Sequence, residues 1–152
     1  MSYPGENSDL AIRRRYREAG LSRQDIERDA LEIYGVEVSE GYPTAAGLIS
    51  AAQVHERFSE ADWLVNGFPV IITAIGMCQG CWVEEIRDET GGLVKKVEFA
   101  TGGWSRCERL IEAVLQNPRI RDRYLASSDG VGYVFLVPTG ELKGKLQLES
   151  PG

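Results

Sequence analysis

Cys78 and Cys81, separated by two residues, form the one short pattern in this sequence with an obvious chemistry. Such a pair can supply half of a tetrahedral zinc site, and only Cys107 and His55 remain to complete the four ligands. A redox-active pair lies where a strand runs into a helix, whereas this pair is expected between two strands. We therefore expect structural cysteines, with no metal and no cofactor, and keep a thiolate–zinc site as the alternative.

A strand-to-helix turn carries a second candidate group, which could bind an anion or hold a nucleophile. Its residues are Gly102, Gly103, Trp104 and Ser105. Two glycines before a helix N-terminus can direct backbone N–H groups at a phosphate or carboxylate. A nucleophile elbow needs a glycine two residues after the serine, and that glycine is absent here. Because Ser105 and Glu108 fit a capping box, we expect a structural turn, with anion binding as the alternative.

A third candidate group is the arginine cluster near the N-terminus. Its members are Arg13, Arg14, Arg15 and Arg17. A basic helix followed by a short second helix could suit a DNA-binding helix-turn-helix. The second helix, however, carries four acids that would repel phosphates. These acids are Asp25, Glu27, Asp29 and Glu32. We therefore expect Arg13, Arg14 and Arg17 to form a solvated face or to dock onto an acidic protein or RNA surface, with a nucleic-acid-binding role in general as the alternative.

Catalysis is not expected from this sequence. A single histidine restricts the choice of general base to carboxylates and thiols. No pair of acid and base residues has a spacing that favours a catalytic role. We therefore assign no catalytic residue.

The elements that position these residues must fit within 152 residues, of which 43% are hydrophobic and 26% charged. A chain of this length buries roughly 70% of its surface on folding, which predicts one domain, residues 1–152. The formal net charge of −6 argues against wholesale coating of nucleic acid. No apolar run approaches a membrane span of ~20 residues, and the first residues lack a signal-peptide pattern. We expect a cytoplasmic protein with no membrane contact.

Residues 1–58 are expected to be mainly helical. Apolar residues recur at helical spacing in the first helix, and Gly20 is placed as its left-handed stop. Ser22 and Asp25 form a box-like cap for a second helix. Residues 45–58 show a weaker helical pattern, which predicts a third helix.

Residues 62–138 are expected to form an antiparallel sheet with one helix, followed by a tail at 139–152. The predicted strands lie at residues 70–75, 82–87, 93–100, 123–128 and 131–138. The predicted helix begins at Ser105 and ends before Pro118. Strands joined by hairpins imply an antiparallel sheet with helices on one face. The expected class is α+β: N-terminal helices, an antiparallel meander, one helix and a C-terminal hairpin that completes the sheet.

Residues 97–138 run from an aliphatic strand through Thr-Gly-Gly-Trp-Ser and a helix to a hairpin with Tyr-x-Phe. This run resembles a pattern in small phage and prophage proteins. The matching residues are Thr101, Gly102, Gly103, Trp104, Ser105, Glu108, Asn117, Ser127, Tyr133 and Phe135. The resemblance implies a phage or prophage origin and a strand-helix-hairpin unit. Val131-Gly132-Tyr133 stands where the group has Gly-Gly-His-Tyr, so a role resting on that histidine does not carry over.

Together these observations predict a small phage-type accessory protein that binds or inhibits a host macromolecule of defence or regulation. Stoichiometric occlusion is what the resemblance implies, because small phage proteins often work by binding. The expected partner is a host protein in the host cell cytoplasm. The alternatives are a nucleic-acid-associated protein that uses the N-terminal arginines and a thiolate–zinc protein.

Overall fold

The fold combines a four-stranded antiparallel sheet and a two-stranded one with several helices, which confirms the α+β class. The computed structural model describes residues 8–39, 42–45, 47–48, 58–76, 80–102, 105–129 and 132–143. Among these residues, no helix has the length and apolar character that crossing a membrane requires.

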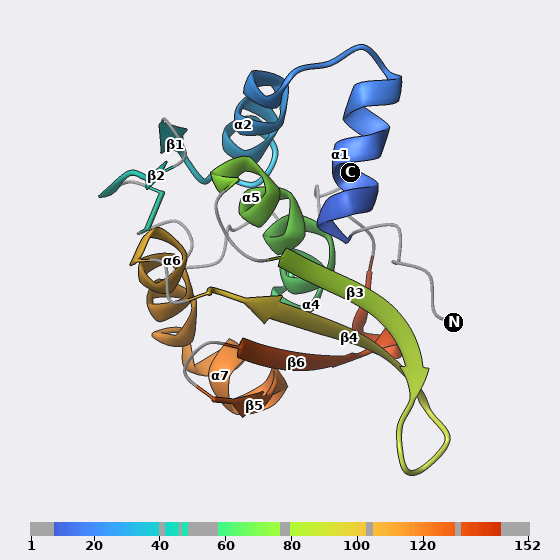
Figure 1. Cartoon of the computed structure of the whole chain (residues 1–152). Helices are drawn as coiled ribbons and strands as arrows, with labels where there is room; N and C mark the ends of the chain where they lie inside the picture. Colours follow the sequence, from blue (N-terminus) through green and yellow to red (C-terminus); the bar gives the residue numbers. More distant parts are fainter. Residues whose placement is uncertain are drawn as a thin grey trace, which may run out of the picture.

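The main sheet has the strand order β3-β4-β6-β5. Its strands are β3 (Gly80–Arg87), β4 (Leu93–Ala100), β5 (Leu125–Ser128) and β6 (Gly132–Pro138). Val83 lies opposite Val97, which lies opposite Phe135, and all three side chains are buried. Because side chains alternate along a strand, this register gives β3, β4 and β6 a common inward face. The expected β3–β4 hairpin and the C-terminal hairpin that joins the sheet are confirmed (Figure 1).

Helices from both ends of the chain pack on this sheet. The longer ones are α1 (Asp9–Glu18), α2 (Arg23–Glu32), α5 (Phe68–Ile75), α6 (Ser105–Leu115) and α7 (Pro118–Tyr124). Figure 1 shows α1, α2 and α5 together on the β3 side, with α6 and α7 at the other end of the sheet. Gly20 and Gly35 have φ values of 75° and 76°, which confirms the left-handed stop expected at Gly20.

Residues 70–75 are helical, so the strand predicted there is wrong. They belong to α5, which follows the short helix α4 (Glu60–Asp62) and a π-helical turn η1 (Trp63–Gly67). Every residue of α5 is buried, and an apolar run that is buried on all sides shows no helical stripe to separate it from a buried strand. Pro69 fits the first turn of a helix, and Gly76, with φ of 80°, ends it.

The expectation of one helix in residues 62–138 is also wrong. Besides α5, the segment contains both α6 and α7, which meet at Asn117. The side-chain oxygen of Asn117 accepts a hydrogen bond of 3.0 Å from the backbone N–H of Arg119. Asn117 therefore caps a new helix, whereas the sequence suggested only that Asn117 and Pro118 stop the previous one.

Three minor elements complete the description. Strands β1 (Val38–Ser39) and β2 (Tyr42–Pro43) form a two-stranded ribbon, and η2 (Thr139–Glu141) is a short 3₁₀ turn in the expected tail. The predicted third helix lies largely outside the described residues, although 45, 47 and 48 are helical.

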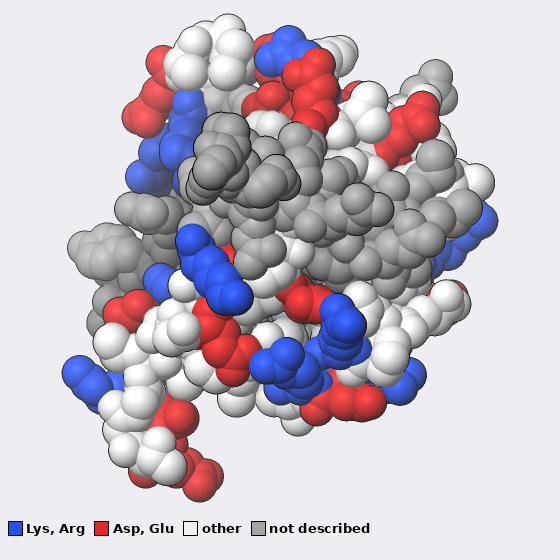
Figure 2. Space-filling model, turned by 180° about the vertical axis from the view of Figure 1, so that it is seen from behind, with Lys and Arg blue, Asp and Glu red and all other residues white. Residues whose placement is uncertain are grey.

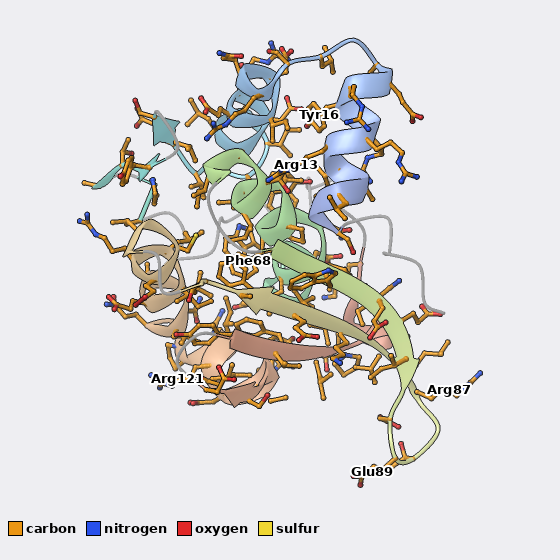
Figure 3. The ribbon with its side chains drawn as sticks, viewed as in Figure 1. Arg13, Tyr16, Phe68, Arg87, Glu89 and Arg121 are labelled. Atoms are coloured by element: carbon orange, nitrogen blue, oxygen red, sulfur yellow. The ribbon has the colours of Figure 1, made fainter. Side chains whose placement is uncertain are left out.

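Phe68 links the helical layer to the sheet (Figure 3). Its ring centroid lies 5.4 Å from that of Trp63, 5.4 Å from that of Phe99 and 6.1 Å from that of Phe135. Two of these contacts are edge-on, an arrangement that aromatic pairs favour. The start of α5 is thereby fixed against β4 and β6.

Ser8 closes part of the outer edge of β3. Its hydroxyl accepts a hydrogen bond of 2.9 Å from the backbone N–H of Val83 and donates to the carbonyl of the same residue at 3.4 Å. Ser8 is only 1% exposed, and its own carbonyl accepts the first helical hydrogen bond of α1, from Ile12. One side chain therefore joins the start of α1 to the sheet.

Candidate functional site

A pocket of about 300 Å³ lies where α1, α2 and α5 meet, and it is the strongest candidate site. Its walls include the guanidinium groups of Arg13, Arg17 and Arg23. Residues four apart on a helix share a face, so Arg13 and Arg17 lie side by side on α1. In Figure 3 the side chains of Arg13 and Tyr16 point from α1 toward α2 and α5.

Arg23 is held in place by the end of α5. Its Nη2 donates hydrogen bonds to the carbonyl of Ala74 at 3.2 Å and to that of Ile75 at 2.9 Å. These carbonyls belong to the last turn of the helix, where the peptide dipoles favour a cation. The guanidinium is therefore fixed at the pocket wall before any ligand arrives.

Acidic residues of α2 have partners other than Arg13 and Arg17. The Asp25 carboxylate accepts from the Ser22 backbone N–H at 2.6 Å and pairs with Arg28 at 2.8 Å. The first of these hydrogen bonds contributes most to lowering the pKa of Asp25, and it belongs to the expected capping box at the start of α2.

The remaining acids near the pocket are similarly engaged. Glu27 pairs with Arg23 at 3.7 Å, and Asp29 accepts a short hydrogen bond from the hydroxyl of Tyr16. Burial, followed by this hydrogen bond, raises the pKa of Tyr16, so its hydroxyl stays protonated and donates. Within the described residues, no ion pair engages Arg13 or Arg17.

The predicted arginine surface is thus divided. Arg13 and Arg17 line the pocket, whereas Arg14 is exposed and does not line it. Figure 2 shows the same local charge from behind: blue side chains gather over α1 at the upper left, while blue and red alternate over the lower part of that face. Positive charge is therefore concentrated along α1 on this face.

Arg23 and the floor of the pocket were missed by sequence reasoning. Thr73 and Gly76 come from the end of α5, the segment that was expected to be a strand. Arg23 follows a recognisable cap at Ser22, but only the packing of α2 on α5 directs it to this site. Helical spacing alone could predict no more than the Arg13–Arg17 pair.

The predicted turn at residues 101–105 is only partly described. Gly102 has φ of 64°, a left-handed conformation that is unfavourable for other residues. Gly103 and Trp104 lie outside the described residues, as does the side chain of Ser105, the first residue of α6. Gly102 does not line the arginine pocket.

Two of the three cysteines are described, and their states differ. Cys107 is disulfide-bonded and fully buried, and Cys81 is a buried, reduced thiol. Cys78 and His55 lie outside the described residues. A disulfide sulfur is not a thiolate, so the form described here cannot use Cys107 as a zinc ligand. In the described part of the chain, no three His, Cys, Asp or Glu side chains form a group that could hold a metal ion.

A second, smaller hollow of about 150 Å³ lies at the β5–β6 hairpin. Glu98, Asp129 and Tyr133 contribute to its walls, and the Asp129 carboxylate accepts from the backbone N–H of Gly132 at 2.7 Å. Its charge is negative, the opposite of the arginine pocket.

The two sites therefore differ in size and sign, and only the larger one combines cations without a described counter-ion and apolar walls. Comparison of the chain with known protein families, curated proteins and solved structures finds no match.

Proposed function

We propose that this protein is a small, non-catalytic binding module that acts on another protein through the pocket between α1, α2 and α5. The observation that carries the proposal is the pair Arg13 and Arg17, without an ion pair among the described residues, beside the anchored Arg23. In a chain with net charge −6, three guanidinium groups in one concavity select an anionic group on a partner.

The target proposed is a host macromolecule of defence or regulation, met in the host cell cytoplasm. This part of the proposal rests on the resemblance of residues 97–138 to small phage proteins. Binding would occlude a surface of the target, with no chemical step.

A nucleic-acid partner is the second candidate, and the four arginines of α1 favour it. Duplex DNA presents one charge per roughly 1.7 Å of its axis, so its binders spread cations along a track. Here two of the four, Arg13 and Arg17, line one pocket together with Arg23, which suits a local anionic group better.

Charge reversal tests the proposed function. The double variant Arg13→Glu/Arg17→Glu removes the pocket charge, and Arg14→Glu is the matched control on the same helix. Each is used with the wild type to capture partners from nuclease-treated host lysate, and the recovered proteins are quantified by mass spectrometry. We expect a partner that wild type and control recover equally and that the double variant loses by at least about tenfold, a difference of ~1.4 kcal/mol.

Equal recovery by the double variant would remove the pocket from the function. Loss of all partners on nuclease treatment, with affinity that falls steeply as salt rises, would instead establish the nucleic-acid candidate. Arg13, Arg14 and Arg17 are all exposed, so we expect the wild type and both variants to have equal melting temperatures. Equal melting temperatures would show that unfolding does not cause the loss of the partner.

A further inference from the structure

We infer that the pocket receives a peptide segment in which an acidic side chain lies next to an apolar one. This inference rests on the proposed function and names its ligand. The acidic side chain contacts the arginines of the lining, and the apolar side chain contacts Leu21. The segment belongs to the partner protein.

The pocket lining combines two chemistries. Arg13, Arg17 and Arg23 form its cationic part, and Leu21 and Ile26 form its apolar part. Leu21 is 42% exposed, whereas Ile26 is 5% exposed and belongs to the core. A carboxylate alone would leave Leu21 in water, while a neighbouring apolar side chain would cover it and add hydrophobic stabilisation.

The cationic part of the lining is partly preorganised. Arg23 uses Nη2 for the carbonyls of α5, and within the described residues its Nη1 has no hydrogen bond. A guanidinium has five N–H donors in a planar fork that matches a carboxylate. Since Arg23 is already fixed, binding requires the ordering of Arg13 and Arg17 only, which reduces the entropic penalty.

Size favours a short peptide segment over larger or smaller ligands. A volume of about 300 Å³ lies at the low end of ligand pockets, which run from roughly 300 to 1,000 Å³. It accommodates a pair of side chains. A free phosphate ion would contact the arginines but leave the apolar part of the lining uncovered, and a nucleic-acid duplex could place only its outer phosphates here.

Defined probes test this inference without knowledge of the partner. The probes are three blocked peptides of equal length whose central residues are Leu-Glu, Leu-Gln or Ser-Glu, together with inorganic phosphate and a short DNA duplex. Each is titrated into the full chain labelled with ¹⁵N. The signals followed are the side-chain N–H groups of Arg13, Arg17 and Arg23 and the backbone N–H groups of Ile26 and Gly76.

We expect saturable shifts at these positions with the Leu-Glu peptide and affinities at least about tenfold weaker for both other peptides. Leu21→Gln should abolish the preference for Leu-Glu over Ser-Glu. Arg17→Gln should abolish the preference for Leu-Glu over Leu-Gln. Arg14→Gln, the matched control, should keep both preferences. Leu21 and Arg17 are exposed, so both variants should retain the wild-type melting temperature.

Three results would overturn the inference: no shift with Leu-Glu at millimolar concentration, phosphate binding as tightly as the peptide, or a preference for the duplex. If the peptides fail while Arg13→Glu/Arg17→Glu still loses a protein partner, the ligand assignment falls and the proposed function stands. If the peptides bind but the double variant keeps its partners, the pocket is a peptide site and the proposed function falls.

Discussion

Gly76 ends α5 and lies directly beside the guanidinium group of Arg23. Its φ is 80°, and a Cβ atom added there would lie 2.7 Å from Nη2 of Arg23. Gly20 has a similar φ of 75°, but no atom lies within 4 Å of its added Cβ. Substitution of Gly20 therefore tests backbone strain alone, whereas substitution of Gly76 tests strain together with displacement of Arg23.

Gly76→Ala should lower the free energy of unfolding more than Gly20→Ala does. Left-handed strain costs about 1 kcal/mol at either position. At Gly76 the arginine must also move, and it then loses its hydrogen bonds to Ala74 and Ile75. Urea denaturation measures both variants, and the side-chain NMR signal of Arg23 should shift only in Gly76→Ala. Equal losses of stability, with that signal unmoved, would show that Arg23 is not held as described.

At the scale of residues, the sequence predicted Arg13 and Arg17, which line the pocket, but grouped them with Arg14, which does not, and missed Tyr16. Arg13 and Arg17 follow from four-residue spacing, which depends on α1 alone. Arg23, Thr73 and Gly76 meet them only through the packing of α2 and α5. A local sequence pattern does not reveal how α2 packs on α5, so the positions of these three residues in the pocket could not be predicted from the sequence.

At the scale of elements, Asp62 holds the C-terminal segment against the helical layer. Its carboxylate is fully buried and accepts the backbone N–H of Lys143 at 3.0 and 3.1 Å, together with the hydroxyl of Ser59 at 2.6 Å. Residues 59 and 143 are thereby tied through one side chain.

Asp62→Asn should lower the free energy of unfolding by about 1–3 kcal/mol, because an amide NH₂ in place of one oxygen leaves buried donors unmatched. Asp122→Asn is the control, since Asp122 is exposed and, among the described residues, pairs only with its neighbour Arg121, at 3.0 Å. That change should stay within roughly 0.5 kcal/mol. Denaturant titration compares the two, and a similar small effect in both would show that the Asp62 contacts contribute little.

Tyr124 makes the attachment of η2 to α7 sensitive to high pH. Its hydroxyl donates to Glu141 at 2.6 Å. Burial first, and then this hydrogen bond, raise the pKa of Tyr124 from 10.0 to about 12. The folded protein therefore holds the proton more tightly than the unfolded chain does, so the stabilisation is complete below the ordinary pKa and is lost as pH rises toward 12.

Tyr124→Phe has no proton to lose, so its stability should decline less between pH 9 and pH 12 than that of wild type. The variant should also be less stable at neutral pH because the hydrogen bond to Glu141 is gone. Urea denaturation across that pH range provides the comparison. Tyr16 also has a raised pKa and is present in both proteins, so part of the loss of stability at high pH should remain in the variant. Parallel pH curves would rule out a role for Tyr124.

The sheet and the first two helices were predictable because their patterns are local. β3 and β4 alternate buried and exposed residues over most of their length, and the α2 cap is a short motif. Helix α5 was not predictable from periodicity, because its β-branched residues are buried on every side. Pro69 and Gly76 were the signals available, since proline early and glycine just past the end are typical of a helix.

At the scale of the whole molecule, the disulfide at Cys107 bears on where the protein works. Intracellular disulfides are uncommon, and the odd number of cysteines gave no pairing from sequence. With three cysteines in the chain and Cys81 reduced, denatured protein should show one reactive thiol before reduction and three after it.

Alkylation of acid-quenched cells, followed by mass spectrometry, measures these thiols in the compartment where the protein accumulates. One reactive thiol in protein taken from the cytoplasm would mean that the disulfide resists the reducing pool. Three thiols before reduction would contradict the disulfide in that compartment and leave Cys107 as a buried thiol.

The hydrogen bonds between Ser8 and Val83 also determine how copies of the protein meet in concentrated solution. A strand at the border of a sheet offers unpaired N–H and C=O groups to any extended chain, which is a route to aggregation. At Val83 both groups are already occupied by a side chain from the same molecule. Ser8→Ala would vacate them, so light scattering at high concentration should rise in the variant. Ser8 thus covers one position on the outer edge of β3.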